Sequence, residues 1–259
     1  MIRTRLGLLG LCAMVFGLMA FGATGAHAEV GAKWLILNSE GKIKTGSELH
    51  ASVGLEIEKN AKGEPVPLVL HSEILKIKTL FLCTEVVVDE AKLLKDGTIG
   101  KEEGVPSGSK VLFGGCTTDL NGSPAPECTP EDSIAGKGKI STAPGHALIV
   151  LHELADKTKD DIVEIIPDAG LGGTFATIKL PAPCPIGTSV PVIGKFFLKD
   201  CEGLALMHLV KHLVESFVPL TELWTISKTE EHKATFLGSA WAFLSDEIDK
   251  GLAWSGDPA

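Results

Sequence analysis

The stretch SELHASVGLEIE, residues 47–58, alternates strictly between apolar and more polar positions. One set of alternate positions holds only apolar side chains: Leu49, Ala51, Val53, Leu55 and Ile57. Because successive side chains of a β-strand point to opposite faces of its sheet, this pattern predicts a strand with one buried and one solvated face.

Further apolar runs have the length and the β-branched content that are typical of strands. They cover residues 33–37, 67–78, 80–88, 110–115, 147–154, 161–166, 174–180, 190–198 and 234–244. Segments rich in Gly, Pro, Asn and Asp separate these runs, as at 38–42, 59–65 and 167–173. Many short strands at this spacing predict an all-β fold, either an antiparallel sandwich or a barrel.

Two segments leave alternatives open. The Pro/Gly-rich stretch 179–191 is either a boundary, near 180–190, between two β-subdomains or a long surface loop. In the stretch 204–217 the apolar residues fit helical spacing, but alternation can be drawn through it as well. The fold class therefore includes at most one short helix, near 205–217.

Residues 1–28 have the three parts of a secretory signal peptide. Arg3 and Arg5 precede a long apolar run, and the small-x-small sequence Ala-His-Ala follows it at 26–28. The run approaches the ~20 residues that span a bilayer, so a membrane anchor is the alternative. Its many glycines and alanines and the Ala-His-Ala exit favour cleavage. We expect residues 29–259 to be secreted or kept at the cell envelope, with no membrane span after cleavage.

The charge balance argues against nucleic acid as a partner. Both arginines of the chain lie in the predicted signal peptide, which leaves 22 lysines against 33 acidic residues, a net charge of −11. Phosphate recognition needs basic patches and bidentate guanidinium contacts. The chain also has no tyrosine and only four tryptophans, so a flat aromatic platform for sugars is not expected. The partner itself is unknown from sequence.

Five cysteines remain after cleavage, and disulfides persist in the environment of an exported protein. We expect Cys116 to pair with Cys128, because Asn121-Gly122 is a strong turn signal between them. Cys184–Cys201 is the second expected bridge, with Cys83 as a buried thiol. The rival arrangement pairs Cys83 with Cys184 and leaves Cys201 free. No cysteine has the setting of a nucleophile or the Cys-x-x-Cys spacing of a zinc site.

The strongest candidate for chemistry is the trio His208, His212 and Glu215. On a helix these side chains share a face and could ligate a metal ion. The metalloprotease pattern H-E-x-x-H is missing, since Leu209 occupies the glutamate position. On a strand the two histidines would share a face instead, which we expect to be the solvated one. We assign no catalytic residue, no metal site and no cofactor, with this trio as the weak exception.

Several short motifs together resemble a group of secreted, functionally uncharacterised actinobacterial proteins. They are WLIL near the start of the mature chain, FLCTE around Cys83, VLFGGC, GKGKIST, and the ending ATFLGSA…GLAWSG. The resemblance implies export and carries no activity or functional residue.

The first hypothesis is an exported, non-catalytic β-domain with a binding or structural role at the cell surface or outside the cell. One alternative is a β-barrel that carries a small apolar ligand and encloses a cavity lined by Leu, Val and Phe. The other is a secreted metal-dependent hydrolase that uses His208, His212 and Glu215. An enclosed apolar cavity or a cluster of His and carboxylates would distinguish them.

Overall fold

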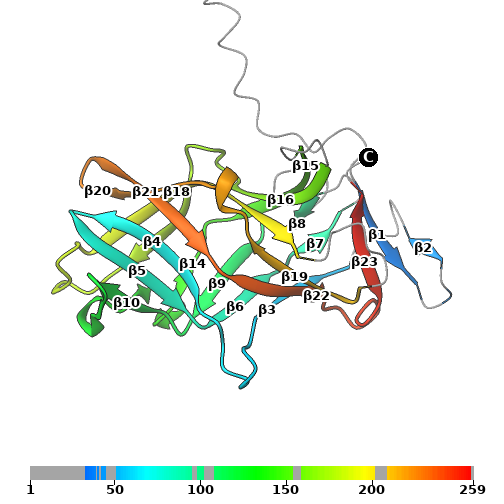
Figure 1. The fold of residues 1–259 in the computed structure, drawn as a ribbon, viewed down its shortest axis with the longest axis horizontal. Coiled ribbons are helices and arrows are strands. Elements are labelled where there is room, and N and C mark those ends of the chain that lie inside the picture. Colours follow the sequence, from blue (N-terminus) through cyan, green and yellow to red (C-terminus); the bar gives the residue numbers. More distant parts are fainter. Residues whose placement is uncertain are drawn as a thin grey trace, which may run out of the picture.

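The computed structural model describes residues 33–38, 40, 42–44, 51–94, 98–101, 108–153, 159–201 and 209–257. The predicted signal peptide and His208 lie outside these residues. The described chain is an all-β protein built of antiparallel strands, as predicted (Figure 1). No helix of this part is long and apolar enough to cross a membrane.

The strands are short and follow one another through tight turns. In chain order they are β1 (Lys33–Leu37), β2 (Ile43–Lys44), β3 (Val53–Ile57), β4 (Leu68–Ile74), β5 (Ile77–Cys83), β6 (Glu85–Asp89), β7 (Lys92–Leu93), β8 (Thr98–Gly100), β9 (Lys110–Gly114), β10 (Thr117–Leu120), β11 (Ser123–Pro124), β12 (Glu131–Asp132), β13 (Gly136–Lys137), β14 (Ile140–Ser141), β15 (Gly145–Glu153), β16 (Lys159–Pro167), β17 (Thr174–Lys179), β18 (Ser189–Asp200), β19 (Lys211–Ser216), β20 (Glu222–Ser227), β21 (Glu230–Leu237), β22 (Ser239–Leu244) and β23 (Ala253–Asp257). Two 3-10 turns, η2 (Pro126–Cys128) and η3 (Val218–Leu220), complete the described elements.

The ambiguous stretch near 205–217 is a strand over its described part. β19 covers Lys211–Ser216 and pairs with β18 and β22, while residues 202–208 lie outside the described chain. The alternation predicted for 47–58 is also present in β3, where Val53 and Ile57 are buried. The segment 180–188 is the connection of a hairpin, since Lys179 of β17 pairs with Ser189 of β18.

One long ladder organises the half of the molecule that carries the disulfides. β5 and β6 run against β10 and β9 in a single register, from Thr79 opposite Leu120 to Asp89 opposite Lys110. Thr84 connects β5 to β6, and Gly115 lies between β9 and β10, so both segments continue through the middle of this ladder. Gly115 has φ +59°, and a Cβ there would meet the Thr84 hydroxyl, so the glycine permits the local kink.

The ladder explains why the expected cysteine pairing is wrong. Leu82 lies opposite Thr117, so the same register places Cys83 opposite Cys116, and these two form a disulfide with Cα atoms 4.0 Å apart. Cys128 in η2 instead reaches Cys184 in the β17–β18 connection, with a Cα separation of 4.9 Å. The predicted bridges Cys116–Cys128 and Cys184–Cys201 are therefore not formed, nor is the rival Cys83–Cys184. Cys201 is a free, exposed thiol.

Two rings of hydrogen-bonded strands make up the body of the protein. The first, which we call the disulfide ring, runs from β4 through the β5–β6 chain, β9, β14, β17, β18, β20 and β21 back to β4. The contact between β14 and β17 is made by the Thr142–Ala176 bridge and by Ala143 N–H, which donates to the Phe175 carbonyl.

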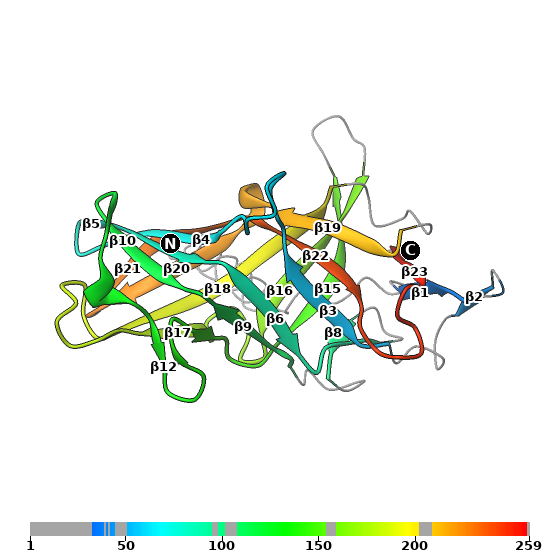
Figure 2. The ribbon, with the colours of Figure 1, turned by 90° about the horizontal axis from the view of Figure 1, so that it is seen from below.

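The second ring, which we call the tryptophan ring, runs through β3, β22, β19, β18, β16, β15, β8 and β7. It returns to β3 at the Ser52–Lys92 bridge, where Val53 N–H donates to the Ala91 carbonyl and Leu93 N–H donates to the Ala51 carbonyl. The three-stranded sheet β2–β1–β23 lies at the far end of this ring (Figures 1 and 2).

Strand β18 belongs to both rings. Its first half pairs with β17 and β20, and its second half pairs with β16 and β19. Gly194 lies near the change of partners, with φ +106° and a neighbouring carbonyl of Glu222 where a Cβ would be. This position therefore excludes any side chain. The core continues from one ring into the other, because Ile165 and Leu198 pack against the buried clusters of both.

The pairing of distant strands is nested along the chain. β1 pairs with β23, β3 pairs with β22, and β4 pairs with β21. The strands nearest the two ends of the described chain therefore lie side by side, as the blue and red strands at the right of Figure 1 show.

Candidate ligand-binding cavity

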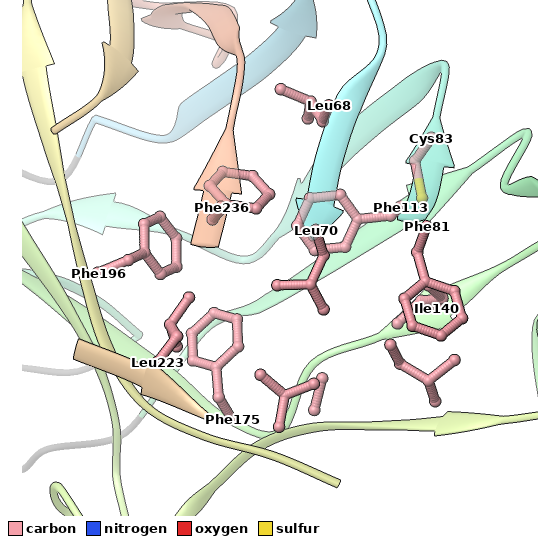
Figure 3. A pocket seen from close by; sticks show the side chains of 13 residues that line it. Leu68, Leu70, Phe81, Cys83, Phe113, Ile140, Phe175, Phe196, Leu223 and Phe236 are labelled. Carbon is pink, nitrogen blue, oxygen red and sulfur yellow. The ribbon is translucent and has the colours of Figure 1, made fainter. Parts of the chain in front are cut away.

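Three apolar cavities follow one another through the interior of the two rings. The disulfide ring holds one of about 50 Å³, shown in Figure 3 with the side chains that point into it. The tryptophan ring holds the largest, of about 110 Å³. A third, of about 50 Å³, lies between them and shares Phe113, Phe196 and Phe236 with the first and Leu55, Val111, Ile165, Leu198 and Val214 with the second. Adjacent cavities thus share part of their lining.

Side-chain size explains why one ring is better filled than the other. Five phenylalanines from five strands surround the cavity of the disulfide ring: Phe81, Phe113, Phe175, Phe196 and Phe236. Phe196 contacts both Phe175 and Phe236, with ring centroids 5.2 Å and 5.0 Å apart, and Phe236 also contacts Phe113 at 6.1 Å. The corresponding inward positions of the tryptophan ring include the small side chains Ala91, Ala147 and Ala242, and these line its larger cavity.

Two tryptophans close the far end of that larger cavity. Trp34 of β1 and Trp254 of β23 both line it, and their ring centroids lie 5.6 Å apart. Trp34 is fully buried and donates its indole N–H to the Thr98 carbonyl, 3.1 Å away. Sequence reasoning gave these tryptophans no role. One tryptophan lies near each end of the chain, and this placement indicates a shared site only when β1 and β23 are known to pair.

Of the weak metal candidates His208, His212 and Glu215, the two that the structure describes do not lie together. His212 is fully buried, whereas Glu215, three residues later on the same strand, is exposed. Residues three apart on a strand point to opposite faces, so these two side chains cannot hold one ion. For a strand we had expected His212 on the solvated face, but its side chain is buried. Among the described residues, no group of three or more His, Cys, Asp or Glu could hold a metal ion.

His212 instead forms a buried polar link between strands. Its Nδ1 lies 2.5 Å from Asp200 Oδ2, and its Nε2 lies 2.8 Å from the Trp254 carbonyl. A carbonyl can only accept, so Nε2 carries a proton, and the Nδ1–Asp200 contact requires a second one. The His212 ring also contacts the Trp254 ring edge-on, with centroids 4.4 Å apart. The link therefore fixes β23, and with it Trp254, to the second ring.

A serine, a histidine and an aspartate near the cavity do not form a catalytic set. His146 Nδ1 lies 3.1 Å from Asp168 Oδ1, and Asp168 Oδ2 accepts a hydrogen bond from Gly108 N–H. Ser109 is paired with Gly145, so its side chain shares the face of Gly145. Both Ser109 and His146 line the cavity, but the Ser109 hydroxyl has no hydrogen-bond partner among the described residues. The hydrogen bond between nucleophile and base that acyl transfer needs is therefore not formed.

The free thiol of Cys201 is a poor nucleophile. Partial burial, followed by the nearby charges of Glu215 and Asp200, raises the pKa of the Cys201 thiol above its ordinary value. Because the thiolate is the reactive form, a raised pKa lowers reactivity at neutral pH.

No protein-family model matches the chain, and no curated protein or solved structure is significantly similar to it. Function must therefore be inferred from the geometry of the chain itself.

Proposed function

We propose that this protein is an exported, non-catalytic β-domain that binds a small apolar molecule inside the tryptophan ring. The observation that carries the proposal is the cavity of about 110 Å³, whose lining is almost entirely apolar. Protein interiors are close-packed, with few voids larger than a water molecule. An apolar cavity of ~150 Å³ stays dry and binds benzene. The present cavity is smaller and suits a ligand of about four or five carbon atoms.

Two further features support a role outside the cell. The protein has two disulfides within its described part, and such bonds persist in oxidising compartments. The sequence of residues 1–28 has the composition of a cleavable export signal. These observations support export, and the cavity supports binding as the role.

The proposal is tested by measuring how benzene and short alkenes change the thermal unfolding of the purified protein. A ligand that binds only the folded state raises the unfolding temperature with increasing concentration. We expect such a shift for the wild type, with native mass spectrometry showing one bound molecule per chain. The absence of a shift up to the solubility limit of every probe would contradict the proposal.

A matched pair of variants shows whether the probe occupies this cavity. Ala242 lines the cavity, so Ala242→Leu fills part of it and should abolish binding. Ala234 is equally buried but lies in the core of the disulfide ring, away from the lining of all three cavities described above. Ala234→Leu should leave the affinity for benzene unchanged. Loss of binding in both variants would indicate a global effect and not a local site.

A further inference from the structure

Trp254, whose side chain lines the tryptophan-ring cavity, carries a hydrogen-bond donor that no described residue uses. Trp254 is 2% exposed, and its indole nitrogen Nε1 has no hydrogen-bond partner among the residues that the structure describes. Its neighbour Trp34 lines the same cavity but donates its N–H to a backbone carbonyl. Buried polar groups almost always have a partner, and an exception in a folded protein requires an explanation.

A second polar group lies in the same cavity. The Ser109 hydroxyl is buried and has no partner in the described chain, and Ser109 lines the cavity. Its inward direction follows from alternation, because Val111 and Phe113 on the same strand face also line cavities. Thr142, which lines the cavity as well, is already engaged, since its Oγ1 accepts a hydrogen bond from Val111 N–H at 2.9 Å.

The two unpartnered groups lie toward opposite ends of the cavity. Ser109 is opposite Gly145 at the start of β15. Ile149 lies four residues further along β15. Its side chain is close to Gly256, and the ring of Trp34 is close to the same glycine. Four strand residues span about 13 Å. A ligand of the proposed size would therefore meet one of these donors at a time, with its apolar body among the alanines.

We infer that the ligand is a neutral, mostly apolar molecule carrying one hydrogen-bond-accepting oxygen, such as a ketone, an ester or an ether. The indole N–H of Trp254 donates to that oxygen at the capped end, and the Ser109 hydroxyl is the alternative donor for a ligand bound in the reverse direction. A charged ligand does not fit, because the one ionisable side chain in the lining, His146, is already paired with Asp168, and an ion buried without a partner is strongly disfavoured. This inference rests on the proposed function and narrows the class of ligand.

The test compares two probes of one shape. One is a methyl ketone of about four or five carbons, and the other is the alkene in which a methylidene group replaces the carbonyl oxygen. Their dissociation constants are measured by titration for the wild type, Trp254→Phe, Ser109→Ala and Trp34→Phe. Removing one neutral hydrogen bond should weaken ketone binding about three- to tenfold and leave alkene binding unchanged. We expect this for Trp254→Phe and, to a smaller degree, for Ser109→Ala.

Trp34→Phe is the matched control, because it removes the same kind of ring from the same cavity but an N–H that is already used. It should change the affinities for ketone and alkene equally. If ketone and alkene respond equally to all three variants, the inference is wrong while the proposed function stands. That result would mean that water, and not a ligand oxygen, partners the two groups. If neither probe binds the wild type, both the inference and the proposed function are wrong.

Discussion

The two rings have a strand in common and a similar closed arrangement, yet one is nearly filled and the other is hollow. The disulfide ring directs phenylalanines inward from five strands, whereas the tryptophan ring directs alanines inward from several of its own. The cavities differ accordingly, at about 50 Å³ and about 110 Å³. The comparison indicates that side-chain volume, and not strand arrangement, decides where this fold can accept a ligand.

The rings also differ in how they are held together. Two disulfides join segments of the disulfide ring that are 33 and 56 residues apart in sequence. The described part of the tryptophan ring has no disulfide, and its end is fixed by the His212 link and the tryptophan pair. One ring depends on covalent bonds and the other on buried polar contacts, so different substitutions should weaken each.

Removal of the disulfides should have the largest effect. Closing loops of these lengths stabilises a protein by about 4 kcal/mol each in the chain-entropy model. The double variant Cys128→Ala/Cys184→Ala should therefore lose about 3–4 kcal/mol of unfolding free energy, measured by urea denaturation. Cys201→Ala, which removes only the free thiol, should stay within about 0.5 kcal/mol of the wild type. Since both rings contain β18, we expect a single transition. Two separate transitions would show that the rings are independent.

Loss of the polar link should weaken the tryptophan ring by a somewhat smaller amount. His212→Phe removes the hydrogen bonds to Asp200 and to the Trp254 carbonyl, and leaves the Asp200 carboxylate buried without its ring partner. We expect a loss of about 3 kcal/mol in chemical denaturation. His71→Phe, at a half-buried position of β4, is the control and should be nearly neutral. Equal stability of the two variants would argue that the link contributes nothing.

Because the two rings differ in packing, the same Ala→Leu substitution should change the unfolding free energy in opposite directions in the two rings. Ala242→Leu fills existing space and should raise the unfolding free energy by about 1 kcal/mol. Ala234→Leu adds the same atoms to a filled core and should lower it by about 1–3 kcal/mol. Differential scanning calorimetry of both variants measures the difference. If both are destabilised alike, the tryptophan ring is not hollow in the way described.

Local pattern was sufficient to predict the fold class but not the site. Alternation around Val53 and Leu55 correctly indicated a strand with a buried face, because period two follows directly from strand geometry. The pairing of Cys83 with Cys116 could not be found in this way, since it depends on the register between two strands 33 residues apart. His212 looked like a solvated residue for the same reason. Its burial depends on neighbours from β18, β22 and β23.

From the sequence, an apolar ligand cavity was predicted only as part of one of the two alternatives to the first hypothesis. Which apolar residues share one interior, and whether their volumes fill it, depends on the order of strands around each ring. Trp34 and Trp254 are 220 positions apart and meet only because β1 pairs with β23. No periodicity within either segment contains that information.

The nested pairing has a consequence for how the polypeptide reaches its native state. β3 meets its strand partner β22, and β4, whose other edge pairs with β5, meets its second partner β21, more than 150 residues later. A ribosome adding about 5–20 residues per second would leave β3 and one edge of the β4–β5 hairpin unpaired for roughly ten seconds or more. The chain must close these large loops before the long-range contacts can stabilise it. The native structure therefore has a high contact order, and folding should be slow. During that interval the exposed early strands would be prone to aggregation, which makes them natural clients for a holding chaperone.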